Sequence, residues 1–139
     1  YGVHTAQYSL LLSTGTQCYF LPVVNVEEYR MGRHDTEMLK GVLEGVVLAV
    51  LARRPAYGYE ITADLRERGF TDLAEGTVYA ILVRIEQRDL VDVEKVASEK
   101  GPPRKVFTLN DTGREQLAEF WTTWGLLADR LEQLRDEGN

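Results

Sequence analysis

Hydrophobic residues recur every three to four positions from Met38 to Leu51, which is the period of an α-helix that buries one face. Asp35 and Thr36 precede this run and are candidate N-caps, and the Arg-Arg-Pro sequence of residues 53–55 ends it. The repeating positions are Leu39, Val42, Leu43, Val46, Val47, Val50 and Leu51. The pattern predicts a buried helix.

Two further helical segments follow. Residues 57–59 (Tyr-Gly-Tyr) lead into one that closes at Gly69, which has the position of a glycine C-cap. Its inward positions are expected to be Ile61, Ala63 and Leu65. The other spans about residues 76–88, and its apolar positions recur at i, i+3, i+4 and i+7. Those positions are Val78, Ile81, Leu82 and Ile85. Together the three segments predict a helix-turn-helix.

The outward face of the third segment carries small, polar and basic side chains. These are Thr77, Tyr79, Ala80, Val83, Arg84, Gln87 and Arg88. A residue as small as Ala80 lets a helix come close to a DNA groove, and arginine and glutamine donate to base edges or phosphates. The face therefore predicts a recognition helix. The alternative for the arginines is solvated surface charge. The hydroxyl groups of Tyr57, Tyr59 and Tyr79 are candidate donors to phosphate, and the alternative for these tyrosines is packing with one wet end.

Alternation of period two begins at Val91. The alternating residues are Val91, Asp92, Val93, Glu94 and Val96, and residues 106–109 are expected to form a second short strand. The connection at residues 98–103 contains a glycine and two prolines, so the pattern predicts a hairpin with a stiffened tip. Its basic residues, Lys100, Arg104 and Lys105, are candidate phosphate contacts. For Lys105 the alternative is a strand position that only supports the hairpin.

The last apolar stripe follows Asn110 and Asp111, both good N-caps. Its members, spaced almost as heptads, are Leu117, Phe120, Trp121, Trp124, Leu127, Ala128, Leu131 and Leu134. Large aromatic side chains bury roughly 150–250 Å² each, so the stripe exceeds the apolar patch that a monomer normally exposes. We therefore expect a second copy of the chain to cover it. The alternative is that the helix packs on its own domain.

These segments predict an α+β, mainly α fold, a winged helix-turn-helix with a C-terminal dimerisation helix. We expect residues 36–110 to form the DNA-binding domain and residues 111–139 the dimerisation helix. Residues 1–35 are an N-terminal extension of uncertain status, because their apolar runs lack helical periodicity. Met31 is a candidate start that would make residues 1–30 appended sequence, and a genuine N-terminal arm is the alternative.

Charge is distributed unevenly along the chain. The formal net charge is −6, yet residues 76–110 carry six basic and five acidic side chains, and residues 111–139 carry three and seven. A mildly basic head followed by an acidic helix predicts DNA binding through a local patch, with an affinity that falls as salt rises.

Composition argues against several other classes of protein. The single Cys18 excludes an internal disulfide, and with only His4 and His34 no zinc ligand set can form, so we expect no metal or cofactor. We expect no enzyme, because no activated nucleophile, acid–base pair or phosphate loop can be assembled. No run of about 18 apolar residues occurs, and residues 10–12 lack the context of a signal peptide, which predicts a cytoplasmic protein.

From Met38 to about Leu134 the chain resembles the PadR family of bacterial transcriptional regulators. The resemblance rests on the order and spacing of several short motifs. They are residues 48–51, 57–61 (Tyr-Gly-Tyr-Glu-Ile), 76–79 (Gly-Thr-Val-Tyr), 84–86 (Arg-Ile-Glu), 101–105 (Gly-Pro-Pro-Arg-Lys) and 109–114. One departure is Ala74-Glu75, where the family usually has a Ser or Asp cap followed by Pro; Glu75 suits a helix N-terminus but brings a negative charge near phosphate.

The resemblance implies a homodimeric repressor of the short subgroup, whose third helix enters the major groove and whose single C-terminal helix makes the dimer. It also implies a planar aromatic effector that stacks on Trp124, or less favourably Trp121, at the dimer centre. The residues assigned to the dimer and effector region are Leu117, Phe120, Trp121, Trp124, Leu127 and Leu131. The predicted function is thus a ligand-responsive regulator on a pseudo-palindromic operator; the alternative is a winged-helix protein–protein module without sequence-specific DNA binding.

Overall fold

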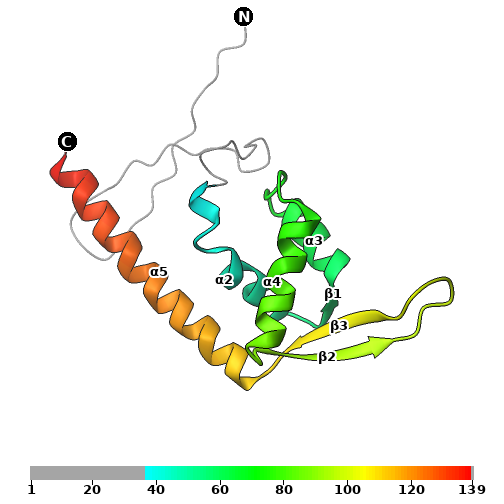
Figure 1. Ribbon diagram of the computed structural model, residues 1–139. Helices are drawn as coiled ribbons and strands as arrows, with labels where there is room; N and C mark the ends of the chain where they lie inside the picture. The colour runs from blue at the N-terminus through cyan, green and yellow to red at the C-terminus, as the bar shows by residue number, and fades with distance from the viewer. Residues whose placement is uncertain (1–36, 139) are drawn as a thin grey trace, which may run out of the picture. The chain divides into compact units, whose positions relative to one another are not determined.

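A computed structural model describes residues 37–138 of the chain, which belong to one compact unit, Met31–Asn139. The predictions for residues 1–36, including the caps Asp35 and Thr36 and the start at Met31, lie outside the described residues. Figure 1 shows short helices gathered beside a small sheet, a hairpin that extends from them, and a long C-terminal helix.

The first predicted helix is interrupted. Helix α2 spans Leu43–Leu51, and a turn precedes it in which the Val42 N–H donates to the Leu39 carbonyl at 2.9 Å. Gly41 lies in this turn, and glycine is a poor helix former, so the apolar period continues through a segment that the backbone does not keep helical. The buried positions of the run are still those expected of one face, namely Leu39, Leu43, Val47, Leu48 and Leu51.

Helix α3 spans Gly58–Glu67 and follows the short strand β1 (Ala56–Tyr57). Its predicted glycine end is confirmed: Gly69 has a φ of 100°, and the Phe70 N–H donates back to the Leu65 carbonyl at 3.1 Å, as in a Schellman motif. One inward position was predicted wrongly, because Ala63 is exposed and Thr62 is buried instead. The Thr62 hydroxyl donates to the Gly58 carbonyl at 3.1 Å, so a polar residue can occupy the core.

Helix α4 spans Glu75–Gln87 and is the predicted third helix. Its four predicted core positions, Val78, Ile81, Leu82 and Ile85, are all buried. The predicted outward positions Thr77, Tyr79, Ala80, Val83, Arg84, Gln87 and Arg88 are all exposed. The periodicity of this segment therefore fixed both faces of the helix.

The hairpin, called the wing below, consists of β2 (Val91–Val96) and β3 (Arg104–Leu109). The two strands pair antiparallel from Val91 opposite Leu109 to Val96 opposite Arg104. The second strand begins two residues before the predicted start, so Arg104 and Lys105 are strand residues. Strand β1 pairs with the other edge of β3, which gives the order β1-β3-β2. This third strand was missed because two residues are too short to show alternation.

Helix α5 spans Asp111–Glu137 and is capped by Asn110, whose side-chain oxygen accepts from the Gly113 N–H at 2.8 Å. Its first turn lies very close to residues 37–110, which are called the head below. A Cβ at Gly113 would stand 2.1 Å from the Leu90 carbonyl oxygen. Two turns later the Phe120 ring packs against Gly45 of α2, where an added Cβ would lie 2.4 Å from the ring. Beyond Phe120, α5 continues for about 17 residues without a buried side chain.

Candidate nucleic-acid interface

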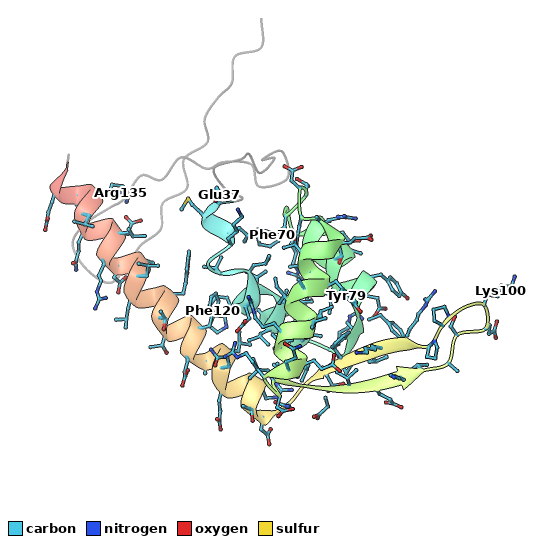
Figure 2. The ribbon with its side chains drawn as sticks, viewed as in Figure 1. Glu37, Phe70, Tyr79, Lys100, Phe120 and Arg135 are labelled. Carbon is cyan, nitrogen blue, oxygen red and sulfur yellow. The ribbon has the colours of Figure 1, made fainter. Side chains whose placement is uncertain are left out.

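An open groove of about 840 Å³ lies between the first turns of α3 and α4 and strand β3. Its walls include two tyrosines, one on each helix, and two basic residues on the strand. The lining residues that matter below are Tyr59, Glu75, Gly76, Tyr79, Arg104 and Lys105. Figure 2 shows Tyr79 on α4 and Lys100 at the tip of the hairpin. The groove thus brings the predicted recognition helix and the predicted wing onto one surface.

Arg104 is held at the wing side of this groove by an aromatic pair. Its guanidinium carbon lies 5.2 Å from the ring centroid of Tyr59, within the range of a cation–π contact. Tyr59 in turn stacks on Tyr57, with ring centroids 5.6 Å apart and an interplanar angle of 9°. Sequence reasoning treated these tyrosines as phosphate contacts or packing and missed this role, since the residues they organise are more than 40 positions away.

Lys105 connects the wing to α4. Its Nζ lies 3.1 and 3.3 Å from the two carboxylate oxygens of Glu86, and both side chains are about one-third exposed. This ion pair agrees with the alternative that Lys105 supports the hairpin. Lys100, by contrast, is exposed at the tip, beside Gly101, whose φ of 148° bends the chain there.

Arg84 and Arg88 lie on the flank of α4 away from the wing, and both have partners within the protein. The Arg84 Nε donates to one carboxylate oxygen of Glu44 at 2.8 Å, and Arg88 Nη1 donates to the other. Arg88 Nη2 also donates to the side-chain oxygen of Gln116 on α5 at 3.3 Å. These two predicted DNA contacts are therefore exposed without being free cations.

The predicted dimer and effector residues separate into two groups along α5. Leu117 is buried and Phe120 is half-buried, because both pack against the head. The remaining large apolar side chains are exposed, with Trp121 at 52% and Trp124 at 47%. The others on the predicted stripe are Leu127, Leu131 and Leu134; Leu126, which the stripe did not include, is exposed as well. The alternative that α5 packs entirely on its own domain is therefore wrong beyond Phe120.

Comparison with known proteins assigns this geometry to a family. The chain matches the transcriptional regulator PadR-like family over residues 47–119, which is more than half of its 139 residues. The chain belongs to the PadR family. It is a DNA-binding transcriptional regulator rather than an enzyme, as the sequence predicted.

Solved structures of PadR proteins have the same fold. A PadR-like transcriptional regulator from Bacillus cereus is 40% identical, with 70% of this chain and 95% of that chain covered and a TM-score of 0.62. A PadR family regulator from Eggerthella lenta is 31% identical over 71% of this chain and 86% of that chain, with a TM-score of 0.66. A Streptococcus transcriptional regulator is 37% identical, covering 71% and 97%, with a TM-score of 0.63. PadR regulators bind DNA and typically dimerise.

The packing of the PadR chain does not require a glycine at position 76. A Cβ added there would meet no described atom within 4 Å, and Gly76 is not among the glycines with positive φ. Glycine inside a helix costs about 0.5–1 kcal/mol relative to alanine. The open position lies on the groove, next to Tyr79.

Across residues 37–138, no helix combines the length and apolar character needed to cross a membrane.

Proposed function

We propose that this PadR protein is a ligand-responsive repressor that binds a pseudo-palindromic operator as a homodimer. The observation that carries the proposal is the exposed apolar stripe of α5, which continues from Trp121 to Leu134 after the head has ended. Two tryptophans of about 150–250 Å² each, with the leucines, make a larger apolar surface than a soluble monomer usually leaves in water. A second α5 offers a matching stripe and covers both.

Pairing through α5 gives the DNA interface its symmetry. A two-fold dimer presents two α4 helices to half-sites about one helical turn apart, and this predicts an operator with two inverted half-sites. In each half-site α4 enters the major groove. Its proposed contacts are Thr77, Tyr79, Ala80, Arg84, Gln87 and Arg88. The open position at Gly76 supports this orientation, since a side chain is absent where the nucleic acid would come closest.

The wing is proposed to bind the neighbouring backbone. Lys100 at the tip and Arg104 on β3 supply the charge, and the Tyr59 ring keeps Arg104 at the edge of the groove. Lys105 is proposed to act mainly through its ion pair with Glu86, which sets the angle between wing and helix. These contacts are largely independent of sequence, so they add affinity and orientation more than selectivity.

A planar aromatic effector is proposed to bind between the paired α5 helices. Trp124 and Trp121 are supported as its contacts by their exposure on the stripe, and Leu127 and Leu131 are exposed on the same stripe. Leu117 and Phe120, which were also predicted for this region, pack against the head and are not proposed as contacts. A flat ligand stacked there would alter how the two helices cross, and with it the spacing of the two α4 helices. Because its target is chromosomal DNA, we propose that the protein acts in the cytoplasm.

Selection of duplexes from a random library by the purified protein tests the proposal. We expect enrichment of inverted half-sites, and binding to the enriched duplex that weakens steeply between about 50 and 200 mM salt. Arg84→Glu should abolish this specific binding while the protein sediments as an unchanged dimer. Enrichment of no sequence, together with no salt-sensitive binding, would favour a winged-helix protein–protein module instead.

A further inference from the structure

The carboxylate of Glu44 occupies a central position among three helices. Glu44 lies in the first turn of α2 and is 21% exposed, whereas the Arg84 and Arg88 side chains that bind it are 55% and 44% exposed. Each of its oxygens accepts from a different arginine, Oε2 from Arg84 and Oε1 from Arg88. Arginine binds phosphate through the same kind of charge-assisted hydrogen bond that it makes with a carboxylate.

The position of this carboxylate is well fixed. Glu44 precedes Gly45, where the Phe120 ring of α5 packs so closely that a Cβ would clash. Gln116, one turn earlier on α5, holds the second nitrogen of Arg88 at 3.3 Å. Helix α5 thus packs against α2 at the residue next to Glu44 and also holds one of the two arginines that bind its carboxylate.

The pairing also changes the charge that α4 presents. Arg84 and Arg88 are four residues apart, so they lie on one flank of the helix and would repel each other if unpaired. With Glu44 between them, the three side chains carry a net charge of +1 instead of +2. Ion pairs this exposed are weak, so a well-placed phosphate can displace the carboxylate.

We infer that Glu44 is a specificity-determining residue of the DNA interface, which neutralises Arg84 and Arg88 until α4 is seated in a matching groove. On random DNA the helix stays at a distance and the arginines keep their internal partner. On the operator, base contacts hold α4 deep enough for phosphates to replace the carboxylate. The inference rests on the proposed DNA-binding function and concerns which cations contribute to each kind of complex.

The test uses Glu44→Gln in the full chain, with binding measured on a random duplex and on the duplex selected by the wild-type protein. Glutamine has nearly the same shape as glutamate, but it is uncharged and has only one acceptor oxygen in place of the two that bind Arg84 and Arg88. For the random duplex we expect the slope of log affinity against log salt to steepen by about 0.9 to 1.8, the value of one or two phosphate contacts. Affinity for it at low salt should rise on the order of tenfold, and affinity for the selected duplex should rise less.

Two comparisons separate this effect from a general change of charge. Glu37→Gln removes the same charge from a carboxylate that pairs with Lys40 and not with an α4 arginine, so it should leave the slope unchanged. In a background with Arg84→Gln and Arg88→Gln, the Glu44→Gln change should have no effect. An equal effect in either comparison would overturn the inference.

A measurement without Glu44→Gln covers the case in which that variant does not fold. Arg84→Gln with Arg88→Gln, made in the otherwise native chain, leaves Glu44 without these two partners and lowers the charge of the three groups from +1 to −1, so binding to both duplexes should weaken. The slope for the selected duplex should fall by about 0.9 to 1.8 more than the slope for the random duplex, because only there do the arginines bind phosphate. An equal fall in slope on both duplexes would show that the arginines already bind random DNA and would refute the role of Glu44. If the wild-type protein binds neither duplex, the proposed function fails; if it binds both and every variant behaves like it, only this inference fails.

Discussion

Helices α4 and α5 each have one face covered by the protein and one face left open, but the open faces differ in chemistry. The open face of α4 is mostly small, polar or basic, with Gly76, Ala80, Gln87 and two arginines beside the exposed Tyr79 and Val83. The open face of α5 is apolar, with Trp124, Leu127 and Leu131. A polar face is stable in water, whereas an apolar face of this size is usually covered by another surface. The difference indicates that α4 meets a polar, grooved partner and α5 meets another apolar surface.

The largest expected effect comes from placing a charge on the open face of α5. Leu131→Asp should convert dimer to monomer, because burial of one leucine contributes about 1.5–3 kcal/mol and a two-fold interface contains it twice. We expect a loss of at least about a hundredfold in dimer affinity, measured by sedimentation at several concentrations. DNA affinity should fall with it, since a single head reads one half-site.

Leu126→Asp is a matched control for that variant. Leu126 and Leu131 are both 53% exposed, but five positions along a helix place them about 140° apart around the axis. Leu126 is therefore off the stripe, and its substitution should leave the dimer intact. Equal loss of the dimer in both variants would contradict dimerisation through the apolar stripe of α5.

The next effect concerns the covered side of α5. Gly113→Ala should lower the free energy of unfolding by about 1–3 kcal/mol, because the new methyl group would meet the Leu90 backbone 2.1 Å away. Chemical denaturation of the dimer at fixed concentration measures this change. An unaltered stability would mean that α5 does not dock on the head as described.

Gly76→Ala should have the opposite effect on stability. A Cβ there meets open space within the protein, so the helix should gain about 0.5–1 kcal/mol. DNA binding should weaken by about tenfold, because the added methyl group keeps α4 from coming as close to the DNA. Denaturation and a binding titration on the selected duplex provide the two values. If the variant gains stability and keeps its full affinity for DNA, Gly76 is not the point at which α4 comes closest to the DNA.

The smallest effect is expected from Trp124→Ala. It should weaken the binding of planar aromatic compounds, followed by quenching of tryptophan fluorescence, more than it weakens binding to DNA. The remaining Trp121 provides the signal in the variant. Equal losses of ligand and DNA affinity would point to a tryptophan that only holds the dimer together.

Local patterns along the chain predicted most of the head. The four core positions of α4, the glycine end of α3 at Gly69 and the cap at Asn110 depend on neighbours a few residues away, and all are confirmed. The open stripe of α5 was also foreseen from its period. What the sequence could not supply were features set by distant segments or by very short ones.

Three such features illustrate the limit. Strand β1 has only two residues, Ala56–Tyr57, and forms because β3 is there to pair with it. Thr62 is buried in place of Ala63 because α2 and α4, which come from other parts of the sequence, decide which side of α3 is covered. Arg84 and Arg88 share the carboxylate of Glu44, which lies 40 or more positions earlier in the chain. The local sequence around the two arginines therefore indicated free cations, although the folded protein pairs both.

Sedimentation of the wild-type protein at micromolar concentration, without DNA or ligand, tests the central claim most directly. If a second α5 covers the open stripe, the mass should be twice the 15.8 kDa of one chain and should stay so across at least a tenfold dilution. A soluble single chain that remains stable at micromolar concentration would contradict the dimer, and with it the paired presentation of α4 to an operator.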